Sequence, residues 1–147
     1  KKLLDKFLFV RPTSFEEQKS AIDQLPKMLN NKVGLVVVDT ITMLYRLERS
    51  FKEDDTANQS LSLQMRLLNE ICRKYNVPVL LTSQVYSSMQ GNSVKIVGGD
   101  ILTYTSKALL EVEHYNGKRK ITLKKHRSLA AGREASFSIV EKGVQKL

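Results

Sequence analysis

The sequence is poor in cysteine and has no long apolar segment. Cys72 is the single cysteine, so no internal disulfide can form, and a reducing, cytoplasmic location is expected. Its place on a predicted helix favours a small packing residue over a nucleophile, because no histidine lies nearby in sequence to activate the thiol. No apolar run approaches the roughly 20 residues that a membrane span requires, so no membrane contact is expected. Repeats and low-complexity segments are also lacking, and 147 residues suit one globular domain.

Acidic residues are missing from one long stretch of the chain. Between His114 and Arg133 there is no Asp or Glu, within a chain whose net charge is +9. The seven basic residues of this stretch are Lys118, Arg119, Lys120, Lys124, Lys125, Arg127 and Arg133. Such a cluster attracts polyanions by counterion release, so nucleic acid or nucleotide phosphate is the expected partner. The alternative is a solvated basic hairpin without a partner.

A strongly apolar run is present at residues 33–38, where four of the five apolar residues are valines. Such a run is typical of a central strand buried on both faces of a parallel sheet. It ends in Asp39 and Thr40, which places the carboxylate at the edge where ligands of open α/β sheets bind. An apolar strand that ends in Asp is typical of a Walker B segment, whose carboxylate holds Mg²⁺ beneath nucleotide phosphates. The alternative is that Asp39 only caps the next turn.

The flanking segments predict a βαβ unit. Residues 7–10 form a short apolar run and predict a strand, closed by Arg11 and Pro12. Ser14 and Glu17 match a capping box, which predicts a helix to about residue 25 that Pro26 ends or kinks. A right-handed crossover then leads into the strand at residues 33–38.

The rest of the chain predicts a long helix, a second parallel strand and a meander. Apolar residues at Leu61, Met65, Leu68, Cys72 and Tyr75 form one stripe of a helix that Asp54 or Asp55 caps. Residues 79–83 predict a strand ending in Gln84, and residues 85–105 predict a long loop. Strands are expected at 109–113, 120–124 and 135–140, with Asn116-Gly117 as a tight turn between the first two.

Several segments together resemble the RecA-like recombinase core, specifically its archaeal RadA/RadB branch. The segments are LVVVDTITMLYR (35–46), VLLTSQV (79–85), IVGGDILTYTS (96–106) and EASFSIVEKGV (134–144), in matching order and spacing along nearly the whole chain. The run Lys125-His126-Arg127 resembles the RadB group more than the RadA group. The resemblance implies an α/β fold of the RecA-like P-loop NTPase kind, with a parallel sheet and antiparallel C-terminal strands. It divides one domain, 1–147, into β/α units (1–84), a loop (85–105) and antiparallel strands (106–147).

The resemblance also implies roles for individual residues. Asp39 would hold Mg²⁺ at an ATP site that includes Thr40, and Gln84 would be the catalytic residue that senses the γ-phosphate. Lys125, His126 and Arg127 would reach the nucleotide of a neighbouring subunit. DNA contacts would come from two loops, at 47–58 and 85–105, through Arg46, Arg49, Lys52 and Lys95.

One family motif does not occur in the sequence. None of the seven glycines lies in a G-x-x-x-x-G-K-[ST] motif, so the chain has no Walker A loop and resembles the C-terminal two-thirds of its family. We therefore expect weak or regulatory ATPase activity at most, and none from this chain alone. The first DNA loop is also rich in acid, with Glu48, Glu53, Asp54 and Asp55.

The resemblance implies a DNA repair and homologous recombination accessory protein. Its expected partners are DNA, the RadA recombinase, a Holliday-junction resolvase and further copies of itself. An ATP-dependent strand-exchange recombinase of the RadA kind is the alternative. A fold-sharing ATPase from another pathway is a third hypothesis, which the Gly98-Gly99 loop makes the weakest.

Overall fold

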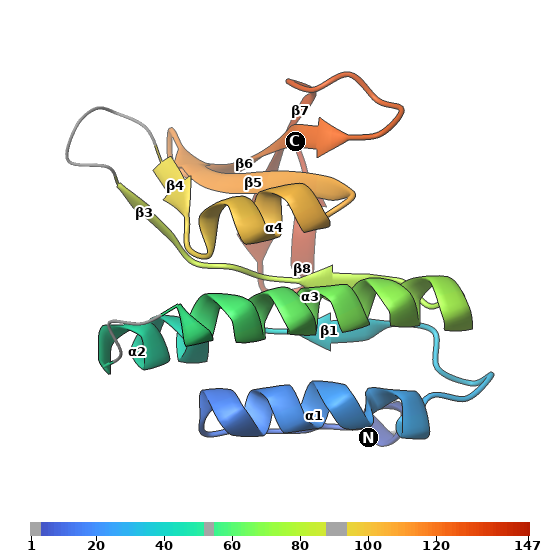
Figure 1. Ribbon diagram of the computed structural model, residues 1–147. Helices are drawn as coiled ribbons and strands as arrows, with labels where there is room; N and C mark the ends of the chain where they lie inside the picture. The colour runs from blue at the N-terminus through green and yellow to red at the C-terminus, as the bar shows by residue number, and fades with distance from the viewer. Residues whose placement is uncertain (1–3, 52–54, 88–93) are drawn as a thin grey trace. The chain divides into compact units, whose positions relative to one another are not determined.

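The structure is a computed structural model that describes residues 4–51, 55–87 and 94–147 (Figure 1). The chain divides into two compact units, residues 1–105 and 106–147. Each unit is described by itself below. Within the described residues, no helix is long and apolar enough to cross a membrane.

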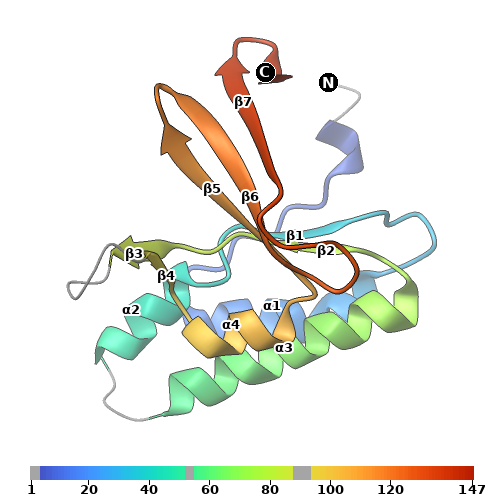
Figure 2. The ribbon, with the colours of Figure 1, turned by 90° about the horizontal axis from the view of Figure 1, so that it is seen from above.

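The first unit is an α/β layer. Its elements are the 3₁₀ helix η1 (Leu4–Lys6), the helices α1 (Phe15–Met28), α2 (Met43–Phe51), α3 (Thr56–Tyr75) and α4 (Gly99–Thr105), and the strands β1 (Val36–Val38), β2 (Val79–Leu81), β3 (Val85–Ser87) and β4 (Val94–Ile96). β1 and β2 are parallel, with Val37 opposite Leu80, whereas β3 and β4 are antiparallel. The helices α1, α2, α3 and α4 lie on one side of β1 and β2 (Figure 2).

The long helix α3 supplies the centre of the core. Leu61, Met65 and Leu68 are at most 2% exposed and pack in one apolar cluster with residues of α1, α2 and α4. The predicted stripe is confirmed at these three positions. In the last turns of α3 the buried face differs from the predicted stripe: Ile71 is buried, whereas Cys72 and Tyr75 are only half-buried. Asp55 is the N-cap residue but makes no capping hydrogen bond, and Asp54 lies outside the described residues.

The helix α1 begins as predicted and ends later than predicted. Ser14 Oγ accepts a hydrogen bond from the Glu17 backbone N–H at 3.1 Å, which satisfies one of the free donors of the first turn. The Glu17 carboxylate accepts from the Thr13 N–H and hydroxyl, both at 2.7 Å, and these bonds lower its pKa. Pro26 does not end the helix, which continues to Met28. Proline removes only its own N–H donor, and beyond it the Leu29 N–H still donates to the Leu25 carbonyl at 3.0 Å.

Two predictions about the sheet are wrong. Residues 7–10 do not form a strand, and their side chains are at least half exposed, although the Phe7 and Phe9 rings stack with centroids 5.7 Å apart. The strand β1 is not buried on both faces, since Val37 is 53% exposed while Val36 is buried. Among the described residues β1 has only β2 as a hydrogen-bonded neighbour. A strand forms only where a second backbone pairs with it. Residues 7–10 do not pair with β1, which has no second strand neighbour among the described residues.

Residues 85–105 are not one loop. They contain β3, β4 and the short helix α4, while residues 88–93 lie outside the description. Val97 N–H donates to the Gln84 carbonyl at 2.9 Å, which extends the β3–β4 pairing to the base of the ribbon. The segment shows little apolar periodicity because it combines two short strands, whose side chains alternate every two residues, with a short helix, whose side chains repeat every 3.6 residues.

The second unit is a four-stranded antiparallel sheet in the order β5 (Ala108–Tyr115), β6 (Lys118–His126), β7 (Glu134–Val140) and β8 (Gly143–Lys146). The predicted turn is confirmed, with φ of 48° at Asn116 and 74° at Gly117, as the two-residue hairpin turn requires. The strand β8 was not predicted from the sequence, because it is only four residues long and fully exposed.

Candidate nucleotide edge and nucleic-acid cavity

The parallel strands β1 and β2 bring Asp39 and Thr82 together at their carboxyl ends. The Thr82 hydroxyl donates to Asp39 Oδ1 at 2.5 Å, and the Ile41 N–H donates to the Thr82 carbonyl at 3.1 Å. Asp39 is exposed, and the Asp39–Thr40 peptide bond is cis. We call residues 39–42 and 82–84 the carboxyl edge.

Gln84 joins the same edge through its backbone. Its N–H donates to the hydroxyl of Thr42 at 3.1 Å, and the Thr42 and Ser83 hydroxyls lie 3.1 Å apart. The Ser83 hydroxyl also donates toward the carbonyl of Val97, at 3.3 Å. The edge is therefore hydrogen-bonded to the base of the β3–β4 ribbon within one compact unit.

The hydroxyl of Thr40 has a local role. It accepts a hydrogen bond from the Met43 N–H at 3.1 Å, which closes the turn before α2. Thr40, and not Asp39, is thus the residue that satisfies this turn.

The donor set of the carboxyl edge suits Mg²⁺ held through a nucleotide. Within the described residues no three His, Cys, Asp or Glu side chains cluster to hold a metal ion. Mg²⁺ in phosphoryl-transfer sites is bound by one or two carboxylates, water and substrate phosphates, so a protein cage is not needed. Asp39 is exposed and contacts a neutral hydroxyl, which leaves its negative charge unneutralised.

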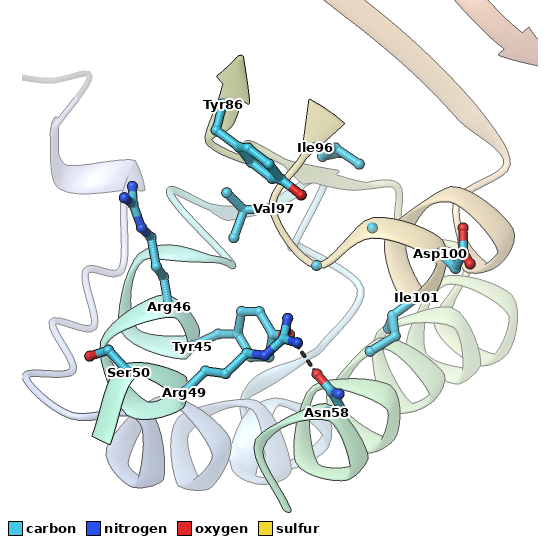
Figure 3. Close-up of a pocket in the computed structure, with 12 residues that line it drawn as sticks. Tyr45, Arg46, Arg49, Ser50, Asn58, Tyr86, Ile96, Val97, Asp100 and Ile101 are labelled. Carbon is cyan, nitrogen blue, oxygen red and sulfur yellow. Dashed lines mark hydrogen bonds between the residues drawn. The ribbon is translucent and has the colours of Figure 1, made fainter. Parts of the chain in front are cut away.

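A cavity of about 630 Å³ lies between α2, the β3–β4 ribbon and the start of α4 (Figure 3). We call it the α2–β4 cavity. Its lining residues are Tyr45, Arg46, Arg49, Ser50, Asn58, Tyr86, Ile96, Val97, Gly98, Gly99, Asp100 and Ile101. Gly98 and Gly99 have φ of 84° and 44°, values that side chains rarely tolerate, and a Cβ on Gly98 would meet Leu61 at 3.2 Å. Gly98 therefore brings the backbone of this wall close to the core.

A chain of hydrogen bonds positions one guanidinium of the cavity. Arg49 Nη1 donates to the Tyr45 hydroxyl at 3.3 Å, and that hydroxyl donates to Asn58 Oδ1 at 2.5 Å. Asn58 Nδ2 in turn donates to Asp55 Oδ1 at 2.6 Å. Tyr45 is 1% exposed, so the chain rests on a fixed residue of the core. Asp55, one of the acids of the predicted first DNA loop, here orients an amide of the cavity wall.

The structure brings together part of the predicted DNA-binding set. Arg46 and Arg49 share the α2–β4 cavity, one helical turn apart on α2. Lys95 is exposed and lies directly opposite Tyr86 in the β3–β4 ribbon, so the two side chains share one face. Lys52 lies outside the described residues.

The predicted basic cluster of the second unit is partly neutralised within its own sheet. Lys120 lies 2.9 Å from Glu113 and 3.1 Å from Glu134, and these hydrogen bonds raise its pKa. Lys124 lies 2.9 Å from Glu111 on the neighbouring strand. The stretch contains no acidic residue in sequence, but antiparallel pairing places glutamates of β5 and β7 beside it in the sheet. The expectation that all seven basic residues are available to a polyanion is therefore wrong for Lys120 and Lys124.

Residues 125–127 lie at the end of β6 and the start of the loop that follows. His126 Nδ1 accepts from the backbone N–H groups of Ser128 and Leu129, at 3.2 and 3.1 Å. These bonds require the neutral ring to carry its proton on Nε2. Arg127 is exposed and Lys125 is half-buried.

Sequence reasoning missed Tyr45, Asn58, Thr42 and Tyr86 as residues of the site. Tyr86 follows Gln84 by two positions, and an aromatic residue at the start of the predicted loop 85–105 was the available signal. The Tyr45–Asn58 and Thr42–Gln84 hydrogen bonds join residues 13 and 42 positions apart, so no local pattern indicates them.

Known proteins of similar sequence and fold include members of a recombination family. The family model described as Rad51 matches residues 1–147. Proteins named "DNA repair and recombination protein RadB" from Methanobrevibacter smithii and Methanococcoides burtonii are 37% and 34% identical to the chain, over 97% and 99% of it. The chain spans 64% and 65% of the length of these relatives. A solved structure described as "Crystal structure of the RadB recombinase" superposes with a TM-score of 0.80 at 33% identity, covering 98% of this chain and 65% of that one. The chain therefore has a RecA-like α/β fold, is similar to RadB proteins and belongs to the Rad51 family.

Proposed function

We propose that this chain acts in DNA repair and homologous recombination as a DNA-binding accessory protein that also binds ATP with Mg²⁺. The chain's similarity to two proteins named for DNA repair and recombination supports this proposal. The observation that carries it is the α2–β4 cavity, which is lined by the guanidiniums of Arg46 and Arg49 and by residues of the β3–β4 ribbon. The base of this ribbon is hydrogen-bonded to the carboxyl edge.

DNA binding through this cavity follows from its charges. Arg46 and Arg49 are exposed cations on one helix, and Lys95 lies on the facing ribbon. Guanidiniums bind phosphate oxygens in pairs of hydrogen bonds, and neutralising a phosphate releases its counterions. Among the described lining residues Asp100 is the one acid, and it lies on the opposite side from Arg46 in Figure 3.

The carboxyl edge is the proposed nucleotide site. Asp39 would hold Mg²⁺, which when bound neutralises phosphate charge. Gln84 carries an amide that both donates and accepts, as a residue that reports the γ-phosphate to the β3–β4 ribbon requires. In a homo-oligomer, Lys125, His126 and Arg127 would contact the phosphates or ribose of the neighbouring subunit's nucleotide. Since the chain lacks a Walker A motif, we expect no phosphate release from ATP by this chain on its own.

The proposed protein partners are a RadA-type recombinase and a Holliday-junction resolvase. The support for them is the resemblance of the chain to its family. Co-purification of the chain with each candidate tests this part, and the absence of both complexes would remove it.

The DNA-binding part is tested by titrating a fluorescently labelled oligonucleotide with the chain at several salt concentrations. We expect Arg46→Ala and Arg49→Ala each to lower affinity and to reduce the slope of log K against log salt by about 1. Arg66→Ala is the matched control, because Arg66 is exposed on α3 and pairs with Glu70 at 3.6 Å. Slopes equal to that of the unmodified chain in both cavity variants would overturn the assignment of phosphates to this cavity.

A further inference from the structure

A small pocket lies in the second unit, at the turn end of the β5–β6 hairpin. Its volume is about 170 Å³, and we call it the hairpin pocket. Its lining residues are His114, Gly117, Lys118, Arg119, Ser138 and Ile139. Three of these six residues are basic and none is acidic. The pocket is smaller than the roughly 300–1,000 Å³ of sites that bury a small molecule, so its size suits a single acidic group.

Arg119 has a nitrogen without a partner in this pocket. Among the described residues its Nη1 is buried and makes no hydrogen bond. Buried polar groups in folded proteins are nearly always hydrogen-bonded, and buried charges are paired. Arg119 lies opposite His114 on β5 and opposite Phe137 on β7, so strand pairing places no acid directly across from it. The partner that this guanidinium lacks is an anionic acceptor.

The glutamates of the strands are paired on the other face of the sheet. They form the ion pairs Lys120–Glu113, Lys120–Glu134 and Lys124–Glu111. Successive side chains of a strand point to opposite faces. Glu113 precedes His114 on β5, and Lys120 follows Arg119 on β6, so the ion pairs lie on one face while His114 and Arg119 lie on the other. These carboxylates therefore do not supply the missing acceptor.

Exposed apolar side chains adjoin the pocket on the face that carries Arg119. Ile139 lines the pocket and is 65% exposed, and its cross-strand partner Val144 is 72% exposed. Val112, two residues before His114 and so on the same face of β5, is 57% exposed. Apolar surface bordered by polar groups marks sites of contact between proteins, and arginine is enriched in such contacts. The surroundings of the pocket therefore favour a protein ligand.

We propose that the hairpin pocket binds a carboxylate of an acidic segment of a partner protein, and that apolar side chains of this segment cover Val112, Ile139 and Val144. Arg119 donates to the carboxylate, and the hydroxyl of Ser138 is a further donor in the lining. The site involves only residues of the second unit, and it goes beyond the proposed nucleotide and DNA sites.

Two other occupants fit the same surface less well. A second copy of the chain, docked through this face, would bring the same basic residues opposite one another, and like charges repel across an interface. Duplex DNA would pair its phosphates with the cations, but its charged backbone gives the exposed apolar side chains no cover. An acidic segment with apolar residues satisfies both the charge and the apolar surface.

The first experiment measures the binding of three labelled peptides of about 15 residues to the whole chain by fluorescence anisotropy. The acidic peptide has leucines along one face of a helix and glutamates beside them. The amide peptide has glutamines in place of the glutamates, and the serine peptide has serines in place of the leucines. We expect the acidic peptide to bind at least about tenfold more tightly than the other two.

Variants assign this preference to the pocket. Arg119→Met removes the guanidinium but keeps a long side chain, and we expect it to weaken binding of the acidic peptide by about ten- to a hundredfold and of the amide peptide by less than about twofold. Val112→Ser should weaken binding of both peptides that contain leucine. The matched controls are Arg66→Met and Leu63→Ser, which remove an exposed arginine and an exposed leucine from α3 and should change neither affinity.

A second readout locates the peptide without relying on affinities. In NMR spectra of the isotope-labelled chain, we expect the acidic peptide to shift the Nε–H signal of Arg119 and the backbone amide signals of residues 112–119 and 137–139. The amide peptide should leave the Arg119 signal in place. The spectrum of each variant without peptide shows whether that variant is folded, so a loss of binding through unfolding is recognised.

Each outcome supports or overturns the proposal. A loss in Arg119→Met that is confined to the acidic peptide, with shifts at the hairpin pocket, supports it. Equal affinities for the acidic and amide peptides, no binding of the acidic peptide, or shifts confined to the first unit would overturn it. Binding of a duplex that falls in Arg119→Met while peptide binding does not would assign the pocket to phosphate. A dimer in sedimentation that Val112→Ser dissociates would assign the face to a second copy. The proposed DNA binding is tested separately, by the oligonucleotide titrations of Arg46 and Arg49 variants.

Discussion

The hydroxyl of Thr42 accepts a hydrogen bond from the backbone N–H of Gln84, at 3.1 Å. The two residues are 42 positions apart and follow the two parallel strands of the first unit. Thr42 is fully buried and also contacts the Ser83 hydroxyl, so one side chain joins the turn after β1 to the end of β2. Through it, the edge that carries Asp39 is connected to the ribbon that carries Tyr86.

Removing this hydroxyl should destabilise the first unit. Thr42→Val keeps the shape of the side chain but leaves the Gln84 N–H without its acceptor, and we expect a loss of about 1–3 kcal/mol in the free energy of unfolding. Thr42→Ser retains the acceptor and is the matched control, measured by urea denaturation. Equal stability of the valine and serine variants would show that the hydrogen bond contributes nothing.

The core prediction concerns α3. Leu61 is 0% exposed, whereas Leu63 on the same helix is 49% exposed. Leu61→Ala removes buried methyl groups and leaves a cavity, so we expect a loss of about 2–5 kcal/mol, and about 0.5 kcal/mol for Leu63→Ala. Thermal and urea unfolding of both variants measure the difference. Similar losses at the two positions would contradict the packing described for α3.

The carboxylate of Glu17 makes the stability of the first unit depend on pH in the acid range. Hydrogen bonds from Thr13 hold its pKa below the ordinary value of 4.5, so the ionised form is stabilised by folding. This contribution is present at pH values above 4.5 and is lost as the pH falls through the lowered pKa. We expect Glu17→Gln to unfold with a weaker dependence on pH in this acid range than the unmodified chain.

The control for that measurement is Glu16→Gln, in the same helical turn. The Glu16 carboxylate lies 3.8 Å from Lys19 in an exposed ion pair and accepts no hydrogen bond from Thr13 among the described contacts. Unfolding midpoints recorded across the acid range compare the two variants. An unchanged acid dependence in Glu17→Gln would refute the role of the Thr13 hydrogen bonds.

The basic end of β6 is expected to bind phosphate groups. Replacing Lys124, Lys125 and Arg127 together by Ala should weaken binding of nucleotide or DNA, because three charges are removed from one short segment. Lys124 already pairs with Glu111, so Lys124→Ala alone should have a much smaller effect than the triple variant. Binding measured by fluorescence anisotropy decides this, and an unchanged affinity of the triple variant would make the segment a solvated surface.

Local signals explain what was predicted well. The stripe of α3, the hydroxyl cap of α1 and the Asn116-Gly117 turn each depend on residues within a few positions of one another, so their patterns are visible along the chain. The run at 33–38 was recognised as a strand for the same reason. The prediction that both faces of this strand are buried was wrong, because the exposure of Val37 depends on which segments pack against the sheet.

Predictions failed where a distant partner decides the outcome. Residues 7–10 have the composition of a strand, but a strand needs a second backbone. The basic stretch after His114 has no acid in sequence, yet antiparallel pairing places Glu113 and Glu134 beside Lys120. Neither the missing partner of residues 7–10 nor the position of Glu134 beside Lys120 is visible in the pattern of a single strand.

The sequence by itself carried the resemblance to the family, in four segments of matching order and spacing. It also placed Asp39 and Gln84 after two parallel strands, because apolar runs and their polar ends are local properties. Only the tertiary structure decided that Tyr45, Arg49, Asn58 and Tyr86 line one cavity. These residues come from α2, α3 and β3, and they meet because a common apolar core packs the helices beneath the ribbon. The physical reason is that packing acts between segments far apart in the chain, whereas patterning acts within each one.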